Sequence, residues 1–137
     1  MTFTERELEY LRSQPLARIA TVDPGGQPDN AAVGFRVEHD GRILVGGMRN
    51  VRTRKWRNVE SGSDRVALVV DDLVSTNPWR PRGIRIYGTA ELLHTEGQFG
   101  QGAYIRITPT VSWSWGIEPS EERGFRPHRT AHAPPGG

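Results

Sequence analysis

Apolar and polar residues alternate with a period of two along most of the chain, which is typical of half-buried β-strands. Residues 83–93 (Gly-Ile-Arg-Ile-Tyr-Gly-Thr-Ala-Glu-Leu-Leu) give the longest example. Turn-forming sequences separate the runs, among them Asp-Pro-Gly-Gly at residues 23–26 and His-Asp-Gly at residues 39–41. The predicted strands cover residues 17–22, 30–37, 42–47, 65–71, 83–93, 103–108 and 111–115.

Helical periodicity is confined to two short segments. Residues 4–13 open with Thr4 and Glu7 at the spacing of a capping box, and Pro15 ends this helix. The second helix, residues 53–59, follows the third strand. The side chains expected to face inward from the first helix are Leu8, Leu11 and Tyr10.

These elements predict a mainly β fold. Six to seven short antiparallel strands with two short helices favour a small closed β-barrel over a sandwich, as does the helix between strands three and four. Residues 72–82 are expected to form a loop. One domain should span residues 1–122, whereas the Pro- and Gly-rich residues 123–137 are expected to form a tail without regular structure.

The composition narrows the class of protein. The 137 residues, 35% hydrophobic and 25% charged, suit one domain with a modest core. The absence of cysteine excludes disulfides, thiolate metal sites and cysteine nucleophiles. No apolar run could span a bilayer and no signal peptide is recognisable, so we expect a cytoplasmic protein with no membrane partner. Because His39, His94, His128 and His132 lack carboxylate or cysteine neighbours at ligand spacing, we expect no metal site.

Five cationic side chains fall within nine residues, at Arg49, Arg52, Arg54, Lys55 and Arg57. The formal net charge of the chain is only +2, so the cations are concentrated here rather than spread over one face. Arginine forks and a lysine ammonium bind phosphate oxygens, and a helix start adds N–H donors. We therefore expect a small phosphorylated ligand and no nucleic acid. The alternative is a solvated basic helix face.

Several motifs match a known family. They are Thr-Arg-Lys-Trp-Arg-Asn-Val at residues 53–59, Arg-Val-Ala-Leu-Val-Val-Asp-Asp-Leu at 65–73, Asn-Pro-Trp-Arg-Pro-Arg-Gly-Ile at 77–84 and Ser-Trp-Gly-Ile at 114–117. The Thr-Arg-Lys turn at residues 53–55 and the Pro-Trp-Arg-Pro-Arg-Gly loop at residues 78–83 are the more specific of them. In these motifs the chain resembles the pyridoxamine 5′-phosphate oxidase-like, FMN-binding split-barrel superfamily. It is most similar to the PPOX-class, coenzyme F420-dependent oxidoreductases. The resemblance implies a split β-barrel enzyme that acts on a small-molecule substrate.

In that family the turn after the third strand holds the cofactor phosphate, so the resemblance implies phosphate contacts from Thr53, Arg54 and Lys55. The cofactor ring is expected to lie against two short backbone segments. These are Ala32, Val33 and Gly34 in the second strand, and Gly46, Gly47 and Met48 at the end of the third. Small residues let backbone N–H groups approach ring atoms, although bends in the barrel would explain the same glycines.

Members of the family are homodimers in which both chains line each site, so the resemblance implies a homodimer here. Trp79 and Arg80 would then reach the partner's cofactor, Trp79 as a stacking surface and Arg80 as an anion contact. Plain packing is the alternative for a tryptophan in a Pro-rich loop. Trp113 and Trp115 share one face of the last strand and are expected in the dimer core.

Coenzyme F420 is the cofactor that the resemblance favours, and FMN is the alternative. F420 carries a polyglutamate tail beyond its phosphate, and Arg49, Arg52 and Arg57 suit that tail. Hydride is expected to pass between C5 of the ring and an activated double bond of the substrate. Water, Tyr87 and Arg80 are all candidates for the proton donor, and no catalytic residue is identified. A cofactor-binding protein without turnover and a basic nucleic-acid-binding barrel are the competing functions.

Overall fold

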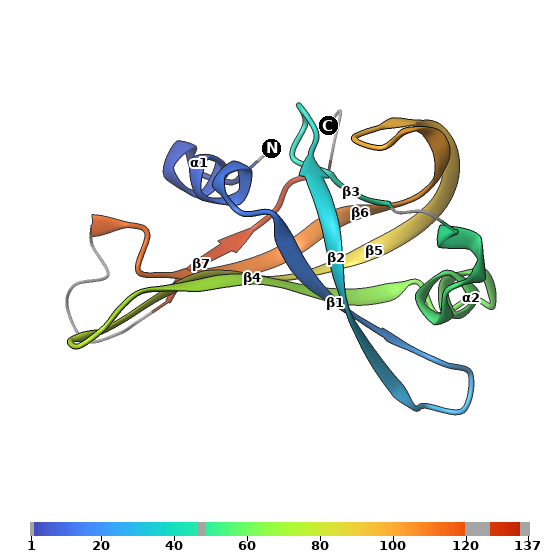
Figure 1. The fold of residues 1–137 in the computed structure, drawn as a ribbon, viewed down its shortest axis with the longest axis horizontal. Helices are drawn as coiled ribbons and strands as arrows, with labels where there is room; N and C mark the ends of the chain where they lie inside the picture. Colours follow the sequence, from blue (N-terminus) through green and yellow to red (C-terminus); the bar gives the residue numbers. More distant parts are fainter. Residues whose placement is uncertain (1, 47–48, 120–126, 135–137) are drawn as a thin grey trace.

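The structure is a computed structural model that describes residues 2–46, 49–119 and 127–134. Its elements, in chain order, are α1 (Glu5–Ser13), β1 (Leu16–Val22), β2 (Pro28–Val37), β3 (Ile43–Gly46), the 3-10 helix η1 (Asn50–Arg52), α2 (Arg54–Glu60), β4 (Arg65–Thr76), β5 (Trp79–Gly97), β6 (Gly100–Trp115) and β7 (His128–Ala131). α1 and α2 lie towards opposite ends of the molecule (Figure 1). Neither α1, with 9 residues, nor α2, with 7, could cross a bilayer, and no other helix of the described chain could.

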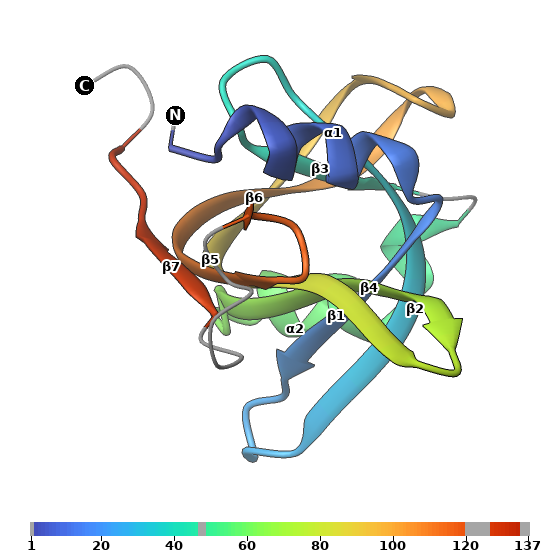
Figure 2. The ribbon, with the colours of Figure 1, turned by 90° about the vertical axis from the view of Figure 1, so that its left-hand side faces the viewer.

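The strands form one antiparallel sheet that closes on itself. Neighbouring strands follow the order β3-β2-β1-β4-β5-β6-β7, and β3 also pairs with β6 through residues 43–45 and 105–107. Strands β1 to β6 therefore form a barrel, seen as a ring in Figure 2, and β7 lies beside β6. This arrangement confirms the predicted mainly β, split-barrel fold.

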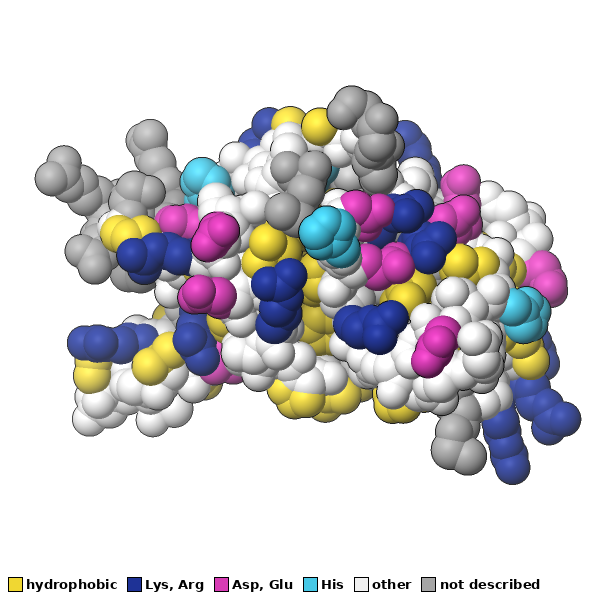
Figure 3. Space-filling model, turned by 90° about the horizontal axis from the view of Figure 1, so that it is seen from above, with side chains coloured by type: hydrophobic (Ala, Val, Ile, Leu, Met, Phe, Trp, Pro, Cys, Tyr) yellow, Lys and Arg dark blue, Asp and Glu magenta, His cyan; other side chains and the backbone are white. Residues whose placement is uncertain are grey.

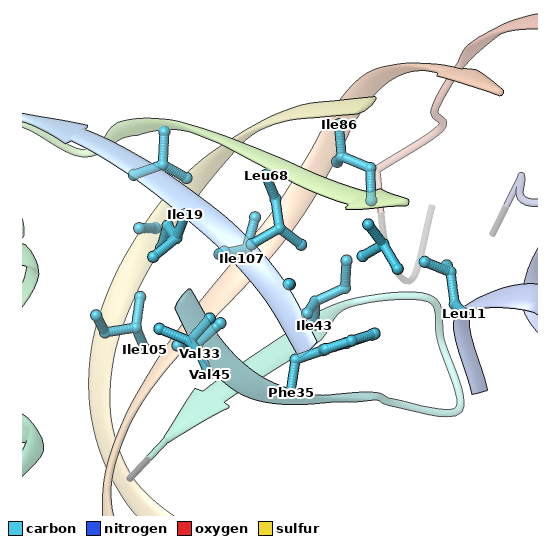
Figure 4. Packing of buried hydrophobic residues seen from close by; sticks show 14 of the residues in the cluster. Leu11, Ile19, Val33, Phe35, Ile43, Val45, Leu68, Ile86, Ile105 and Ile107 are labelled. Atoms are coloured by element: carbon cyan, nitrogen blue, oxygen red, sulfur yellow. The ribbon is translucent and has the colours of Figure 1, made fainter. Parts of the chain in front are cut away.

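The core lies inside the barrel and is built from alternating strand residues. In β5, Ile84 and Ile86 are fully buried, whereas Arg85 and Tyr87 face outward. Figure 4 shows aliphatic and aromatic side chains from all six barrel strands pointing into one space, with Leu11 of α1 at its edge. Each such side chain contributes about 1.5–3 kcal/mol on burial, so the alternation selects this closed sheet.

The sequence predicts α1 correctly. The Thr4 hydroxyl accepts a hydrogen bond from the Glu7 N–H (3.1 Å), and the Glu7 carboxylate accepts one from the Thr4 N–H (3.0 Å). This capping box satisfies N–H groups that the first helical turn leaves unpaired. The predicted inward side chains, Leu8, Tyr10 and Leu11, are buried.

Residues 72–82, predicted to be a loop, instead extend β4 and β5 into a long hairpin, so this prediction was wrong. Thr76 pairs with Trp79, which makes residues 77–78 the turn. The Pro-Trp-Arg-Pro sequence reads as a loop because proline lacks an N–H group. Here β6 pairs with β5 only from Gly83 onward, and prolines are tolerated where a strand edge has no neighbour.

Residues 103–108 and 111–115, predicted as two strands, are parts of the single strand β6. Pro109 interrupts the alternation in the sequence, but it lies opposite Gly88 at a bulge, where the pairing with β5 shifts by one residue. A bulge tolerates proline because the local ladder is already disrupted.

Part of the predicted tail forms a strand. Residues 128–131 pair with β6 as β7, which corrects the expectation that 123–137 lack regular structure. Beyond β7, His132 Nε2 lies 2.7 Å from Ser112 Oγ, and the Phe3 ring meets the imidazole edge-on at 4.5 Å between centroids. Composition missed this strand because its contacts come from β6 and the N-terminal segment rather than from its own apolar pattern.

Candidate functional site

The basic turn that the sequence singles out lies between β3 and α2. Thr53 is the N-cap of α2: its hydroxyl accepts from the Trp56 N–H (3.3 Å) and donates to the Asn50 carbonyl (2.6 Å). The hydroxyl hydrogen is therefore used within the chain. A hydrogen bond from Thr53 to a phosphate would require its bond to the Asn50 carbonyl to open.

Lys55 is buried in this turn and has no bonded partner among the described residues. It is 9% exposed, and no hydrogen bond or ion pair joins it to another residue of the described chain. Burial lowers the pKa of its ammonium below the ordinary value, and the charge of Asp29 partly offsets this effect. A buried cation is unfavourable unless an anion neutralises it, so an anion beside Lys55 would be stabilising.

The arginines around Lys55 are exposed. Arg54 Nε lies 4.0 Å from Asp29 Oδ1, so Arg54 and Lys55 share one acidic neighbour. The outer arginines, Arg49, Arg52 and Arg57, form no ion pair and no side-chain hydrogen bond with the residues that the structure describes. Cationic side chains project from the end of the molecule that carries α2 (Figure 3). The turn thus presents several cations whose charges are available to a ligand.

The segment of β2 predicted to face the cofactor ring is partly covered. Val33 is buried in the barrel core, so its side chain is not available, and its neighbours Ala32 and Gly34 have the outward positions. A Cβ at Gly34 would lie 2.8 Å from the amide end of Gln98 and 3.0 Å from Cζ of Phe99. The tip of the β5–β6 hairpin therefore lies against this face.

Gly46, at the end of β3, lies against an aromatic ring. The ring of Tyr104 occupies the space that side chains at Gly46 and Gly97 would need, which explains both glycines. A ligand could meet Gly46 only through its backbone edge. Gly47 and Met48 lie outside the described residues, so their ring contacts stay predictions.

A hollow of about 310 Å³ opens between the basic turn and the β5–β6 hairpin. Residues 49–51 form one wall, and residues 99 and 101–104 form the other. This volume is at the low end of small-molecule sites, which span roughly 300–1,000 Å³. Sequence reasoning missed the hairpin wall, where the available signal was a single aromatic residue, Phe99, in a Gly-rich stretch.

Trp79 and Arg80 lie at the tip of the β4–β5 hairpin, at the end of the molecule opposite α2 (Figure 1). One chain therefore does not bring them to Lys55. Trp79 is 65% exposed, and Leu73 and Val74 on the same hairpin are 43% and 57% exposed. Exposed apolar side chains gathered on a projecting arm are typical of an interaction surface.

Tyr87, a candidate proton donor, lies on the outer face of β5 beside Trp113 of β6. Their rings meet edge-on at 5.0 Å between centroids, and the Arg85 guanidinium lies 4.4 Å from the centre of the Trp113 ring. Trp115 lies on the same side of β6 as Trp113, because buried serines alternate with both. Both tryptophans are thus outside the barrel core, on a face where a second chain could pack.

A second hollow of about 310 Å³ lies between α1 and the start of β5. On its wall, Arg82 donates to both oxygens of Asp72 (2.8 and 3.1 Å), and the Tyr10 hydroxyl donates to Asp72 Oδ1 (2.8 Å). The bonds from Arg82 lower the pKa of Asp72, and burial raises the pKa of Tyr10. Tyr10 therefore stays protonated at neutral pH and ties α1 to the hairpin.

Comparison with known proteins identifies the family. A model described as pyridoxamine 5′-phosphate oxidase matches residues 3–122, which is most of the chain. The chain belongs to this family. A relative from Streptomyces rimosus subsp. rimosus is named 5a,11a-dehydrotetracycline/5a,11a-dehydrooxytetracycline reductase. The two chains are 42% identical over 123 residues, and the alignment covers 86% of each. The protein is therefore an oxidoreductase of the pyridoxamine 5′-phosphate oxidase-like family.

Solved structures share the fold at low sequence identity. A conserved hypothetical protein from Mycobacterium tuberculosis is 20% identical, with a TM-score of 0.68 over 96% of this chain and 93% of that one. A haem-binding protein from Mycobacterium smegmatis is 13% identical, with a TM-score of 0.67 over 96% of this chain and 60% of that one. Because a haem-binding protein shares the barrel, the fold alone does not determine which ligand binds. The ligand has to be inferred from the residues of the turn.

Proposed function

We propose that the protein is a reductase that binds coenzyme F420, or FMN in its place, at the turn before α2 and transfers hydride to a small organic substrate. Lys55 is the observation that carries this proposal. Its ammonium is buried beside Asp29 but has no bonded partner in the described chain. A phosphate here would supply the missing counter-charge through a charge-assisted hydrogen bond.

The other turn residues have separate roles in the proposed site. Arg54 is exposed and only 4.0 Å from Asp29, so its guanidinium can turn from that carboxylate onto the phosphate. Thr53 shapes the turn through its bonds to Asn50 and Trp56 and contacts the phosphate less directly than the sequence suggests. The ring would lie beyond the phosphate, towards the outer faces of β2 and the end of β3.

F420 is preferred to FMN because of the outer arginines. Arg49, Arg52 and Arg57 are exposed and have no carboxylate partner among the described residues. FMN ends at its phosphate and would leave these charges unused, whereas a polyglutamate tail would meet them. This preference is electrostatic, so it should weaken as salt is added.

The bound cofactor supplies the hydride chemistry, and the chain positions it and holds the substrate against it. The relative from Streptomyces rimosus is named as a reductase of a dehydrotetracycline. We therefore propose an activated carbon–carbon double bond in a small organic molecule as the group that is reduced. Water, Tyr87 and Arg80 stay the candidates for the proton donor.

The active form in this proposal is a homodimer. Trp79 and Arg80 lie far from the basic turn of their own chain, on an arm with exposed apolar side chains. The arm would reach the cofactor of a second copy, with Trp79 against the ring. A monomeric mass by light scattering at micromolar concentration would remove the shared site from the proposal.

The proposed function is tested by titrating the purified protein with F420, FMN and FAD and recording difference spectra. We expect F420 to bind most tightly, and reduced F420 to be oxidised in the steady state when acceptors with activated double bonds are added. Tight binding without turnover of any acceptor would favour a non-catalytic binding protein. Binding of oligonucleotides that falls steeply with salt, with no binding of either cofactor, would favour a nucleic-acid-binding barrel.

A further inference from the structure

The tip of the β5–β6 hairpin curls back over the barrel towards β3 (Figure 1). Gly97 pairs with Gly100, so Gln98 and Phe99 form the two-residue turn at this tip. Phe99 lies against Gly34 of β2, where a Cβ would be 3.0 Å from Cζ of the ring. An aromatic side chain from a distant part of the chain therefore covers the β2 surface predicted to face the cofactor ring.

The position of the tip is fixed by hydrogen bonds rather than by burial of Phe99. The Tyr104 hydroxyl donates to the Gly100 carbonyl (2.7 Å) and accepts from the Phe99 N–H (3.0 Å). In the amide orientation that pairs both groups, the Gln98 side chain donates to the Phe35 carbonyl (2.6 Å) and accepts from the Phe35 N–H (3.3 Å). The backbone of the tip is thus held in place while the Phe99 ring stays 57% exposed.

Phe99 also forms part of the hollow beside the basic turn. That hollow has a volume of about 310 Å³, and its opposite wall is the segment 49–51, which leads directly to Lys55. A planar ring system bound there would have the Phe99 ring on one side and, on the other, the turn that continues to Lys55. Aromatic rings gain free energy from offset or edge-on stacking beyond the area that they bury.

We propose that Phe99 stacks on the ring of the bound cofactor and contributes an aromatic surface from this chain's own half of the site. The inference rests on the proposed function, because it supplies the ring contact that Lys55 and Arg54 cannot make. Trp79 would then contact the ring of the partner's cofactor, so each ring would meet one aromatic residue from each chain. Phe99 is a binding residue in this account and takes no part in proton transfer.

The test uses riboflavin and FMN, which share the ring and differ by the phosphate. Dissociation constants are measured by fluorescence titration for the parent protein, Phe99→Ala, Phe99→Trp and the control Val22→Ala, which truncates another exposed apolar side chain (38% exposed). We expect Phe99→Ala to weaken riboflavin and FMN by the same factor, about threefold to tenfold. Phe99→Trp should retain the affinity and quench the bound flavin more than the parent does, and Val22→Ala should change neither constant.

Two results would overturn the inference. If the parent binds riboflavin and Phe99→Ala binds it equally well, Phe99 does not touch the ring. If Phe99→Ala binds riboflavin more tightly, Phe99 only obstructs the surface at Gly34. The same variants are titrated with F420, for which the same factor is expected. Failure of the proposed function is distinguishable from both results, because the parent protein itself would then bind neither a flavin nor F420. Melting temperatures of all variants show that each is folded.

Discussion

Arg106 and Arg42, near the closure of the barrel, differ from the cations of the turn before α2 in their partners. Arg106 of β6 makes two hydrogen bonds to the Glu38 carboxylate (2.7 and 3.2 Å), and in the adjacent turn between β2 and β3 Arg42 lies 2.8 Å from Asp40. In the turn, Lys55 has only the longer-range charge of Asp29, and no carboxylate bonds to the outer arginines within the described chain. The position of the carboxylates therefore separates the two sets of cations.

Under the proposed function, this difference separates structural charges from charges that would serve a ligand. The pair of Arg106 and Glu38 joins β6 to the end of β2 close to where β3 and β6 close the barrel. Both side chains are mostly buried, 18% and 19% exposed, and a bidentate pair there fixes strand positions. An unpaired buried ammonium contributes nothing of that kind and destabilises the ligand-free fold, which is the expected cost of a binding site.

The largest predicted effect is on stability and concerns Arg106. Arg106→Met keeps an apolar stem of similar length but leaves the Glu38 carboxylate without its partner. We expect the free energy of unfolding to fall by about 2–4 kcal/mol, with little change in cofactor affinity. Urea denaturation measures the first quantity and spectral titration the second. Arg57→Met is the matched control from the turn, and a loss of stability as large as that of Arg106→Met would erase the distinction between the regions.

The stability of the fold is also expected to depend on pH through His132, because this side chain is partly buried. A buried imidazole can stay neutral near pH 7, so His132 needs no anion beside it. Burial lowers the pKa of His132 to about 4, whereas an unfolded histidine has a pKa of about 6.5. The unfolded state therefore binds more protons between these values, so the contribution is complete above pH 6.5 and is lost as the pH falls to 4. We expect a loss of roughly 1–3 kcal/mol over this range.

Unfolding of the parent and of His132→Gln at pH 7 and pH 4 checks this expectation. The variant should lose less stability on acidification, because glutamine keeps a polar group near Ser112 but does not titrate. Identical pH profiles for the two proteins would assign the acid sensitivity to other groups.

A smaller effect is predicted at Asp29, the acidic neighbour of Lys55 and Arg54. Asp29→Asn removes the charge that competes with a phosphate for these cations, so FMN and F420 should bind about twofold to fivefold more tightly. The ligand-free protein should at the same time become slightly less stable. Weaker binding in Asp29→Asn would mean that the carboxylate helps to hold the ligand, contrary to the assignment of the turn as an anion site.

The smallest effects belong to the outer arginines. Each should contribute only about 0–1 kcal/mol to F420 binding, because exposed charges are screened by water and salt. The Arg49→Ala/Arg52→Ala/Arg57→Ala variant should therefore weaken F420 selectively, most of all at low salt, and leave FMN unchanged. Equal weakening of both cofactors would mean that these arginines shape the phosphate turn. Tighter binding of FMN than F420 by the parent would identify FMN as the cofactor.

The barrel could be predicted from the sequence because its strands are half buried and alternate visibly, as in residues 83–93. The α1 cap could be predicted because Thr4 and Glu7 make a purely local pair of hydrogen bonds. The outer part of the β4–β5 hairpin could not, since outside the barrel no buried face imposes the alternation. The strand β7 was missed for the same reason, because its stabilising contacts lie on other segments.

The candidate site was predictable only in part. The cluster of cations identified the turn, but which cation is buried depends on tertiary packing, and so does the proximity of Asp29, which precedes Lys55 by 26 positions. The sequence assigned Gly34 and Gly46 to a ligand, whereas in the fold the ring of Phe99 lies against the first and that of Tyr104 against the second. These contacts join residues more than fifty positions apart, and no local pattern reports them.

The central claim, that Lys55 holds the phosphate of the cofactor, is tested most directly by Lys55→Met. This change removes the charge but keeps the length and burial of the side chain. Affinity for FMN and for F420 should fall by about tenfold to a hundredfold, roughly 1.5–3 kcal/mol, while affinity for riboflavin, which has no phosphate, should not change. The ligand-free variant should also melt at a higher temperature than the parent, since an unpaired buried charge is gone. Undiminished affinity for both phosphorylated cofactors in Lys55→Met would contradict the account.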